Sequence, residues 1–116
     1  MAVTIFHNPR CSKSRQTLAL LEAHGVEPKI VEYLKTPPNR ATLVALLRKL
    51  GMPARELLRR TEPEYAELGL GAPGVSEDAL LDALTAHPKL IERPIVVVGR
   101  RARIGRPPEA VLEILP

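Results

Sequence analysis

The residues best suited to chemistry lie in one short stretch, residues 5–15, which contains the only cysteine of the sequence, Cys11. An apolar strand pattern over Val3–Phe6 runs into a proline-containing turn, and a helical pattern begins at Cys11 or Ser12. A thiol at this junction faces the free backbone N–H groups of a helix N-terminus. Such N–H groups lower a thiol pKa and attract an anion to the same place. The stretch therefore predicts a reactive thiolate beside an anion site.

The side chains around Cys11 favour the same conclusion. The basic residues within four positions of it are Arg10, Lys13 and Arg15. Because positive charge stabilises a thiolate, these residues favour ionisation of the thiol. The alternative is an inert, buried cysteine, which is common for isolated thiols. The neighbours Pro9 and Ser12 are turn-forming and polar residues that are unusual in a core, so we favour a reactive Cys11.

An oxyanion beside this thiolate calls for arginine, whose planar guanidinium binds two oxygens at once. The candidates are Arg15, Arg59, Arg60, Arg93 and Arg106. Arg93 and Arg106 gain weight because they flank a predicted hairpin whose ends could approach Cys11. Pro94 follows Arg93 directly, and the bond between them is either an ordinary trans bond or a cis bond that places a backbone edge beside the Cys11 turn.

His7 lies four residues before Cys11, where a histidine could act as a base or hydrogen-bond partner of the thiol. The alternative is a half-buried strand residue without a chemical role. His24 and His87 fall at predicted helix ends, where the helix dipole is sufficient explanation. No spacing of His, Cys, Asp and Glu predicts a metal ligand set, and no glycine-rich phosphate loop occurs. We therefore expect no bound metal or cofactor.

Composition limits the classes of protein that the chain can belong to. A single cysteine excludes an internal disulfide and fits a reducing compartment. The formal charge is +4, but aromatic residues make up only 3% and no dense basic run occurs, which argues against nucleic-acid binding. No segment has the pattern of a signal peptide or the length of a membrane span. We expect a cytoplasmic protein without membrane contact.

The elements that position these residues form two groups at the ends of the chain. The first is a βαβ unit with parallel strands, predicted over residues 3–6, 12–24 and 28–33. The apolar face of its helix is predicted to consist of Leu18, Ala19 and Leu21. The second is a ββα unit, predicted as strand 95–98 covered on both faces, its hairpin partner 101–104 and a helix opened by Pro107. This final helix is expected to carry Val111, Leu112 and Leu115.

Between these two groups the sequence predicts a helical insertion over about residues 39–90. Helical spacing of leucines begins after Asn39 and ends at Gly51, and Ser76 provides a second N-cap. Shorter helical pieces are expected near residues 53–58 and 63–68. The whole of residues 1–116 is predicted to be one α/β domain of the thioredoxin-like type, βαβ plus ββα with this insertion.

Several ordered motifs carry a resemblance to a known family. They are Phe6-His7-Asn8-Pro9-Arg10-Cys11-Ser12-Lys13-Ser14-Arg15, Tyr33-Leu34-Lys35-Thr36-Pro37-Pro38, Arg55-Glu56-Leu57-Leu58-Arg59, His87-Pro88 with Arg93-Pro94-Ile95-Val96-Val97, and Arg106-Pro107-Pro108-Glu109. Over nearly its whole length the chain resembles the glutaredoxin-coupled arsenate reductases. It is most similar to the arsenate-reductase-like subgroup that carries Arg-Cys-Ser-Lys-Ser-Arg.

The resemblance implies a thioredoxin-like fold, Cys11 as catalytic nucleophile and three anion-binding arginines: Arg59, Arg93 and Arg106. The supporting residues that it implies are His7, Ser14, Arg15 and Pro94. Arsenate would form an adduct with the Cys11 thiolate and leave as arsenite. Because the chain has no second thiol, glutathione is expected as co-substrate and glutaredoxin as partner.

Two other functions remain open at this point. A related family of redox-sensing regulators uses the same fold to bind RNA polymerase, often through a Cys-x-x-Cys switch. Ser14 stands at the second position of that motif, so such a switch cannot form here. The other alternative is a glutathione-dependent thiol oxidoreductase that acts on a different substrate.

Overall fold

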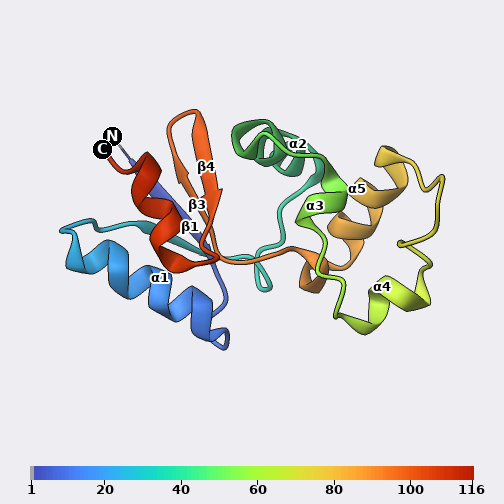
Figure 1. The fold of residues 1–116 in the computed structure, drawn as a ribbon, viewed down its shortest axis with the longest axis horizontal. Coiled ribbons are helices and arrows are strands. Elements are labelled where there is room, and N and C mark those ends of the chain that lie inside the picture. Colours follow the sequence, from blue (N-terminus) through green and yellow to red (C-terminus); the bar gives the residue numbers. More distant parts are fainter. Residues whose placement is uncertain (1) are drawn as a thin grey trace. The chain divides into compact units, whose positions relative to one another are not determined.

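The computed structural model describes residues 2–116, in which four strands form one mixed sheet in the order β2-β1-β3-β4 (Figure 1). The strands are β1 Val3–His7, β2 Lys29–Glu32, β3 Ile95–Val98 and β4 Arg101–Ile104. β1 pairs in parallel with β2 and antiparallel with β3, and β3 forms an antiparallel hairpin with β4. The predicted βαβ arrangement followed by a β-hairpin is confirmed.

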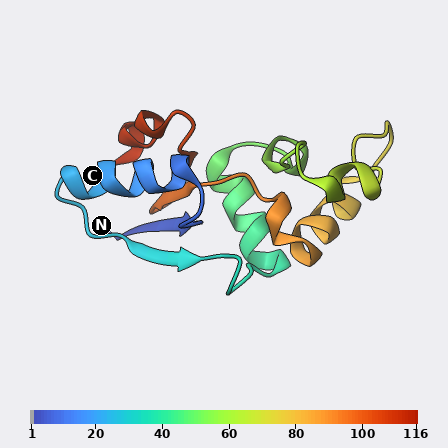
Figure 2. The same ribbon diagram turned by 90° about the horizontal axis from the view of Figure 1, so that it is seen from below.

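The α-helix α1 (Ser12–Ala23) and the 3₁₀ helix η2 (Pro108–Ile114) lie side by side on one face of this sheet (Figures 1 and 2). Their buried partners on the strands are Val3, Ile5, Val96 and Val98. Because alternate residues of a strand share a face, the register that pairs β1 with β3 places all four on the side that the two helices cover. On the opposite side Val97 stays partly exposed, so the predicted coverage of β3 on both faces is incomplete.

The buried stripe of α1 differs from the predicted one. Ala19 is exposed and Leu18 packs against the core only partly buried, whereas Ser14, Thr17 and, as predicted, Leu21 are fully buried. The spacing of three and four residues places these last three on one helix face. Two of them are polar, and Thr17 is accommodated because its Oγ1 donates to the Lys13 carbonyl oxygen at 2.8 Å. The positions of the apolar residues therefore identified only part of the buried face of α1.

The last helix also departs from expectation, because it is 3₁₀ rather than α-helical. Its buried residues are Pro108, Val111 and Ile114, whereas Leu112 and Leu115 are only partly buried. A 3₁₀ helix has three residues per turn, so residues three apart lie on one face. Val111 is buried as predicted. Leu112 and Leu115 were placed on the same face by assuming the α-helical period, and this part of the prediction is corrected.

The chain divides into two compact units. The first contains the sheet and consists of the residues up to 36 together with residues 93–116, and the second consists of residues 37–92. The second unit holds α2 Arg40–Leu50, α3 Ala54–Leu57, α4 Pro63–Glu67, α5 Glu77–Ala86 and the 3₁₀ helix η1 Pro88–Leu90. That the two units act as one domain over residues 1–116, with an insertion over about residues 39–90, stays a prediction.

Local capping chemistry defines the helices of the second unit. Asn39 Oδ1 accepts the Thr42 backbone N–H at 2.9 Å, and Ser76 Oγ accepts that of Ala79 at 3.1 Å. Gly51 ends α2 with a positive φ of 70°, a conformation that suits glycine. These caps stand where the sequence predicted them.

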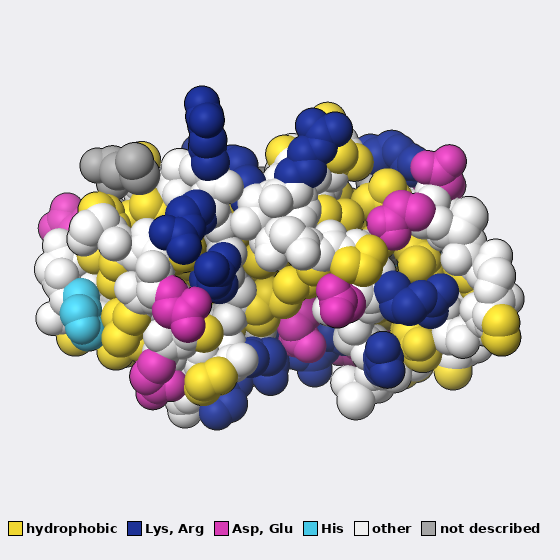
Figure 3. Space-filling model, turned by 45° about the horizontal axis from the view of Figure 1, so that its top comes forward, with side chains coloured by type: hydrophobic (Ala, Val, Ile, Leu, Met, Phe, Trp, Pro, Cys, Tyr) yellow, Lys and Arg dark blue, Asp and Glu magenta, His cyan; other side chains and the backbone are white. Residues whose placement is uncertain are grey.

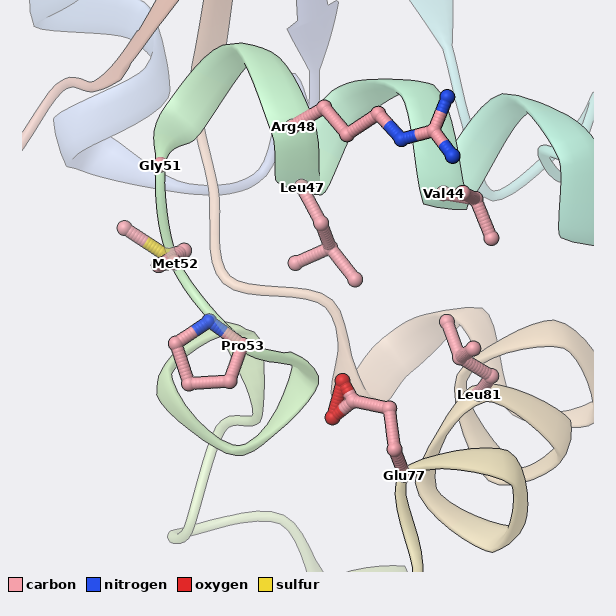
Figure 4. A pocket seen from close by; sticks show the side chains of 8 residues that line it. All are labelled: Val44, Leu47, Arg48, Gly51, Met52, Pro53, Glu77 and Leu81. Carbon is pink, nitrogen blue, oxygen red and sulfur yellow. The ribbon is translucent and has the colours of Figure 1, made fainter.

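A cavity of about 470 Å³ lies inside the second unit, between the C-terminal half of α2 and the start of α5 (Figure 4). Its walls include the apolar side chains of Leu47 and Leu81. The Glu77 carboxylate on its edge accepts the Ala54 backbone N–H through both oxygens, at 3.1 and 3.2 Å. This carboxylate therefore fixes the start of α3 against α5.

The surface carries charges of both signs. On the face drawn in Figure 3, Lys and Arg side chains stand among acidic and hydrophobic ones. Within residues 2–116 no helix combines the length and the apolar character needed to cross a bilayer. The predicted lack of nucleic-acid binding and of membrane contact stays a prediction.

Candidate active site

Cys11 occupies the N-cap position of α1, at the end of a tight turn. Its backbone N–H donates to the Asn8 carbonyl oxygen at 3.0 Å, and its own carbonyl oxygen accepts the Arg15 N–H at 3.0 Å. The Asn8 side chain accepts the Arg10 N–H at 3.0 Å, and this local hydrogen bond stabilises the turn. Cys11 itself has an extended backbone, with φ −95° and ψ 124°. The sequence thus places the thiol directly beside the first N–H groups of the helix.

A buried hydrogen-bond network holds this turn in place. Ser14 Oγ accepts the Asn8 backbone N–H at 3.0 Å and lies 2.6 Å from Nδ1 of His7. Burial lowers the pKa of His7, an effect that Arg15 reinforces and Glu32 opposes, so the ring favours its neutral form. In the tautomer with Nε2–H, the Ser14 hydroxyl donates to Nδ1 while its oxygen accepts the Asn8 N–H. No hydrogen bond between His7 and Cys11 occurs within residues 2–116, so His7 acts on the turn.

Replacing Ser14 by alanine should destabilise the protein by about 1–3 kcal/mol, because the Asn8 N–H and the His7 ring lose their buried partner. Chemical denaturation of both proteins measures this difference. Ser12→Ala is the matched control, since Ser12 is exposed in the same helical turn. Equal stability losses in the two variants would show that the network does not hold the turn.

Arg93 and Arg106 meet beside the thiol. Arg106 Nε donates to the Arg93 carbonyl oxygen at 2.8 Å, and its Nη2 lies 3.6 Å from Cys11 Sγ. The Arg93–Pro94 bond is cis, which is one of the two forms that the sequence allowed, and the Arg106–Pro107 bond is cis as well. The Gly105 N–H donates to the Pro94 carbonyl oxygen at 2.9 Å, which ties the two segments together.

The pKa of Cys11 is lowered from its ordinary value. Partial burial of the thiol acts in the opposite direction and raises the pKa, and it is the largest single influence. The Ser14 backbone N–H, the Arg93 guanidinium and the Lys13 backbone N–H together outweigh it. Arg93 acts both through a side-chain hydrogen bond to the sulfur and through its charge. The helix start thus favours the thiolate, as the sequence predicted. The cation that contributes is the distant Arg93, and not the side chains of Arg10, Lys13 and Arg15 that the sequence indicated.

Gly105 allows the Arg106 segment to approach α1. A Cβ at this position would lie 2.5 Å from Thr17 Oγ1 and 2.8 Å from Pro94 Cγ. Thr17 is fully buried, and Pro94 is also buried, so neither can move aside freely. The absence of a side chain at Gly105 is therefore required for Arg93 and Arg106 to reach their places beside Cys11.

Gly105→Ala should consequently destabilise the protein by about 1–3 kcal/mol, the usual cost of overpacking a core. It should also slow the alkylation of Cys11 near neutral pH, because the arginines shift away from the sulfur. Gly71→Ala is the comparison: its Cβ would meet only the outer part of the Tyr65 ring, with the Tyr65 hydroxyl at 2.9 Å. Thermal unfolding and alkylation rates measure both effects, and a Gly105 variant as stable as the Gly71 variant would contradict the packing argument.

The remaining predicted residues have other surroundings. Arg15 Nη1 donates to the Pro9 carbonyl oxygen at 2.9 Å, so this arginine braces the turn. Arg59 belongs to the second unit, where its side chain contacts Glu62 at 3.5 Å and Glu92 at 3.1 Å. Its role in binding an anion with Cys11 stays a prediction. Arg60 is exposed in the same unit.

Sequence reasoning missed three residues that build the site: Asn8, Thr17 and Gly105. The Asn-Pro pair at residues 8 and 9 is a turn signal that could have pointed to Asn8. For Thr17 and Gly105 no local signal exists, because their importance arises from contact between segments far apart in the chain. Residues 2–116 contain no group of three or more His, Cys, Asp and Glu side chains arranged to hold a metal ion.

The strand order and the βαβ unit followed by a hairpin are those of a thioredoxin-like α/β protein. Its site has a single cysteine at the start of the first helix, with two arginines beside the thiol. The chain belongs to the ArsC family, which it matches over residues 6–114. The predicted arsenate reductase family and the predicted thioredoxin-like fold are both confirmed.

The relatives are similar over nearly the whole chain. The arsenate reductase of Rhizobium meliloti is 51% identical, covering 100% of this chain and 83% of the relative. The uncharacterized protein YfgD of Escherichia coli is 60% identical, covering 97% of this chain and 96% of the relative. Among solved structures, the arsenate reductase from Vibrio cholerae superposes with a TM-score of 0.97 at 54% identity, covering 99% of this chain and 98% of that one.

Proposed function

We propose that the protein reduces arsenate to arsenite through a covalent adduct on Cys11, with glutathione as co-substrate and glutaredoxin as partner. The observation that carries the proposal is the Cys11 thiol, with its lowered pKa, 3.6 Å from an arginine nitrogen of Arg106. Relatives named arsenate reductase that are 51% and 48% identical to this chain support arsenate as the anion. The reducing cytoplasm is the compartment in which such a lone thiol stays reduced.

Binding of the anion uses the same groups that stabilise the thiolate. The Lys13 and Ser14 N–H groups lower the pKa of the thiol, and the Arg93 and Arg106 side chains lie beside it. These donors can hydrogen-bond the oxygens of a tetrahedral oxyanion and neutralise its charge. Arg59 is proposed as the third arginine, contributed by the second unit.

The chemistry then proceeds in three balanced steps. The Cys11 thiolate attacks arsenic(V), an arsenic–oxygen bond breaks and the oxygen leaves as water after protonation. A glutathione thiolate next attacks the Cys11 sulfur: a sulfur–sulfur bond forms, the sulfur–arsenic bond breaks, and its electron pair leaves with arsenic, which becomes arsenite. Glutaredoxin finally takes the glutathione from the mixed disulfide and restores Cys11. An external thiol is needed because the chain has only one cysteine.

The test is arsenite formation by the purified protein with arsenate, glutathione and glutaredoxin, with each component omitted in turn. We expect repeated turnover only from the complete mixture. When glutaredoxin is left out, the protein should release at most about one arsenite per Cys11 and accumulate as the Cys11–glutathione mixed disulfide. No arsenite from the complete mixture would overturn the proposal. Glutaredoxin-like turnover of a glutathione adduct without any reduction of arsenate would instead assign the protein to the thiol oxidoreductases.

A further inference from the structure

A second opening adjoins the Cys11 turn in the first unit. It is a cavity of about 180 Å³ between the Asn8–Arg10 turn and the end of β2, where Glu32 and the following residues Leu34 and Lys35 form its wall. The floor includes the buried His7 ring, which the Ser14 hydroxyl holds. None of the steps in anion binding uses this cavity.

The register of the sheet places the cavity and the arginines on opposite sides of the turn. β1 pairs with β2 on one side, with His7 opposite Glu32, and with β3 on the other, with Phe6 opposite Ile95. Of the cavity residues on this side, Glu32 ends β2 and Leu34 and Lys35 follow it. Arg93 lies two residues before β3 and contacts Arg106. The Cys11 turn, which leaves the end of β1, therefore lies between them.

Two cations and one anion line the cavity. Arg10 and Lys35 are cations, and Glu32 is a carboxylate whose oxygen lies 3.5 Å from Lys35 Nζ. Leu34, 39% exposed, adds an apolar patch. Two cations and one anion complement a small molecule with two carboxylates and one ammonium group, and glutathione carries these charges at neutral pH. We propose that this cavity binds glutathione, an inference that rests on the proposed function and assigns its thiol co-substrate a site.

The geometry of the second chemical step supports this assignment. A thiolate that displaces a leaving group from a sulfur atom approaches opposite the bond that breaks, as in thiol–disulfide exchange. In the Cys11 adduct that bond leads to arsenic, which the Arg93 and Arg106 side holds. The attacking thiol must therefore arrive from the side of the sulfur away from these arginines. The cavity is lined by the turn residues that precede Cys11, Asn8 to Arg10, so a molecule bound there has its thiol next to that turn.

A titration with S-methylglutathione tests the site without any redox step. We expect shifts of backbone amide NMR signals at Asn8, Arg10 and Leu34, and smaller ones at Arg93 and Arg106. Arg10→Ala and Lys35→Ala should each weaken binding about three- to fivefold, and the double variant about tenfold, as expected for partly exposed charge contacts. Lys29→Ala is the matched control, because Lys29 is an exposed cation of β2 that does not line the cavity. Its affinity should equal that of the unmodified chain.

Three results would overturn the site: no binding of S-methylglutathione, equal affinity in the double variant, or shifts confined to the Arg93 and Arg106 side. A double variant that binds S-methylglutathione normally but is slow with glutaredoxin would assign the cavity to the protein partner instead. In the complete assay the double variant should raise KM for glutathione about tenfold and leave KM for arsenate unchanged. The titration contains no arsenic, so it tests the glutathione site even if the protein does not reduce arsenate. The arsenite assay tests the proposed function independently.

Discussion

Cys11→Ser should abolish arsenite formation from arsenate, glutathione and glutaredoxin. We expect a loss of roughly a thousandfold or more, the scale seen when an enzyme loses its nucleophile. The serine hydroxyl is not ionised near neutral pH, and it cannot form the sulfur–arsenic bond or the mixed disulfide. No other cysteine in the sequence can replace it. Steady-state arsenite production by the two proteins measures the loss.

The same variant should keep its fold, which separates lost chemistry from lost structure. Cys11 makes its structural hydrogen bonds through the backbone, to Asn8 and Arg15, and the N-cap position favours serine. Its thermal unfolding midpoint should therefore match or exceed that of the unmodified chain. Arsenite formation at an undiminished rate in a folded Cys11→Ser protein would remove this thiol from the mechanism.

Features that depend on local chemistry could be predicted from the sequence. The β-branched run of Ile95–Val98 is a strand, Asn39 and Ser76 cap their helices, and Gly51 ends α2. Each of these depends on residues within a few positions of one another, so the pattern contains the cause. The position of Cys11 at a strand-to-helix junction belongs to the same group.

Features that hydrophobic spacing does not encode could not be predicted in this way. The buried face of α1 includes Ser14 and Thr17 because His7 of β1 and the Lys13 carbonyl oxygen satisfy their hydroxyl groups. Hydrophobic spacing instead predicts that Ala19 is buried, whereas Ala19 is exposed. The 3₁₀ form of η2 likewise changes which side chains face the core, from a spacing of four to a spacing of three.

The candidate site combines both kinds of feature. The thiol and its helix are local, but Arg93 and Arg106 come from segments flanking the hairpin that only sheet pairing brings beside β1. Arg15 is closer in sequence, yet its guanidinium donates to the Pro9 backbone. Proximity along the chain was therefore a poor guide to which arginine faces the sulfur, and the close approach at Gly105 explains how the distant ones reach it.

Arg93→Gln and Arg106→Gln should each weaken arsenate binding by about 1.5–3 kcal/mol, which corresponds to roughly a 10- to 150-fold loss of affinity, if each donates a charged hydrogen bond to the anion. Arg93→Gln should in addition raise the pKa of Cys11, because the hydrogen bond and charge of Arg93 lower it. A higher pKa leaves less thiolate at neutral pH, so alkylation should slow there and recover as the pH rises. Arg106→Gln removes both the contact at 3.6 Å and the bond to the Arg93 carbonyl oxygen.

Iodoacetamide alkylation of Cys11 between about pH 5 and 9 measures the pKa, and protection by increasing arsenate measures the affinity. Arg100→Gln is the matched control, since Arg100 is an exposed arginine in the turn between β3 and β4 of the same unit. It should change neither quantity, because long-range charge effects on the surface are screened by salt. If Arg93→Gln and Arg100→Gln gave the same pH profile, the hydrogen bond and charge of Arg93 would not contribute to the lowered pKa of Cys11. If arsenate protected Arg93→Gln and Arg106→Gln as well as the unmodified chain, the anion would be bound through backbone donors, with the guanidinium groups as neighbours only.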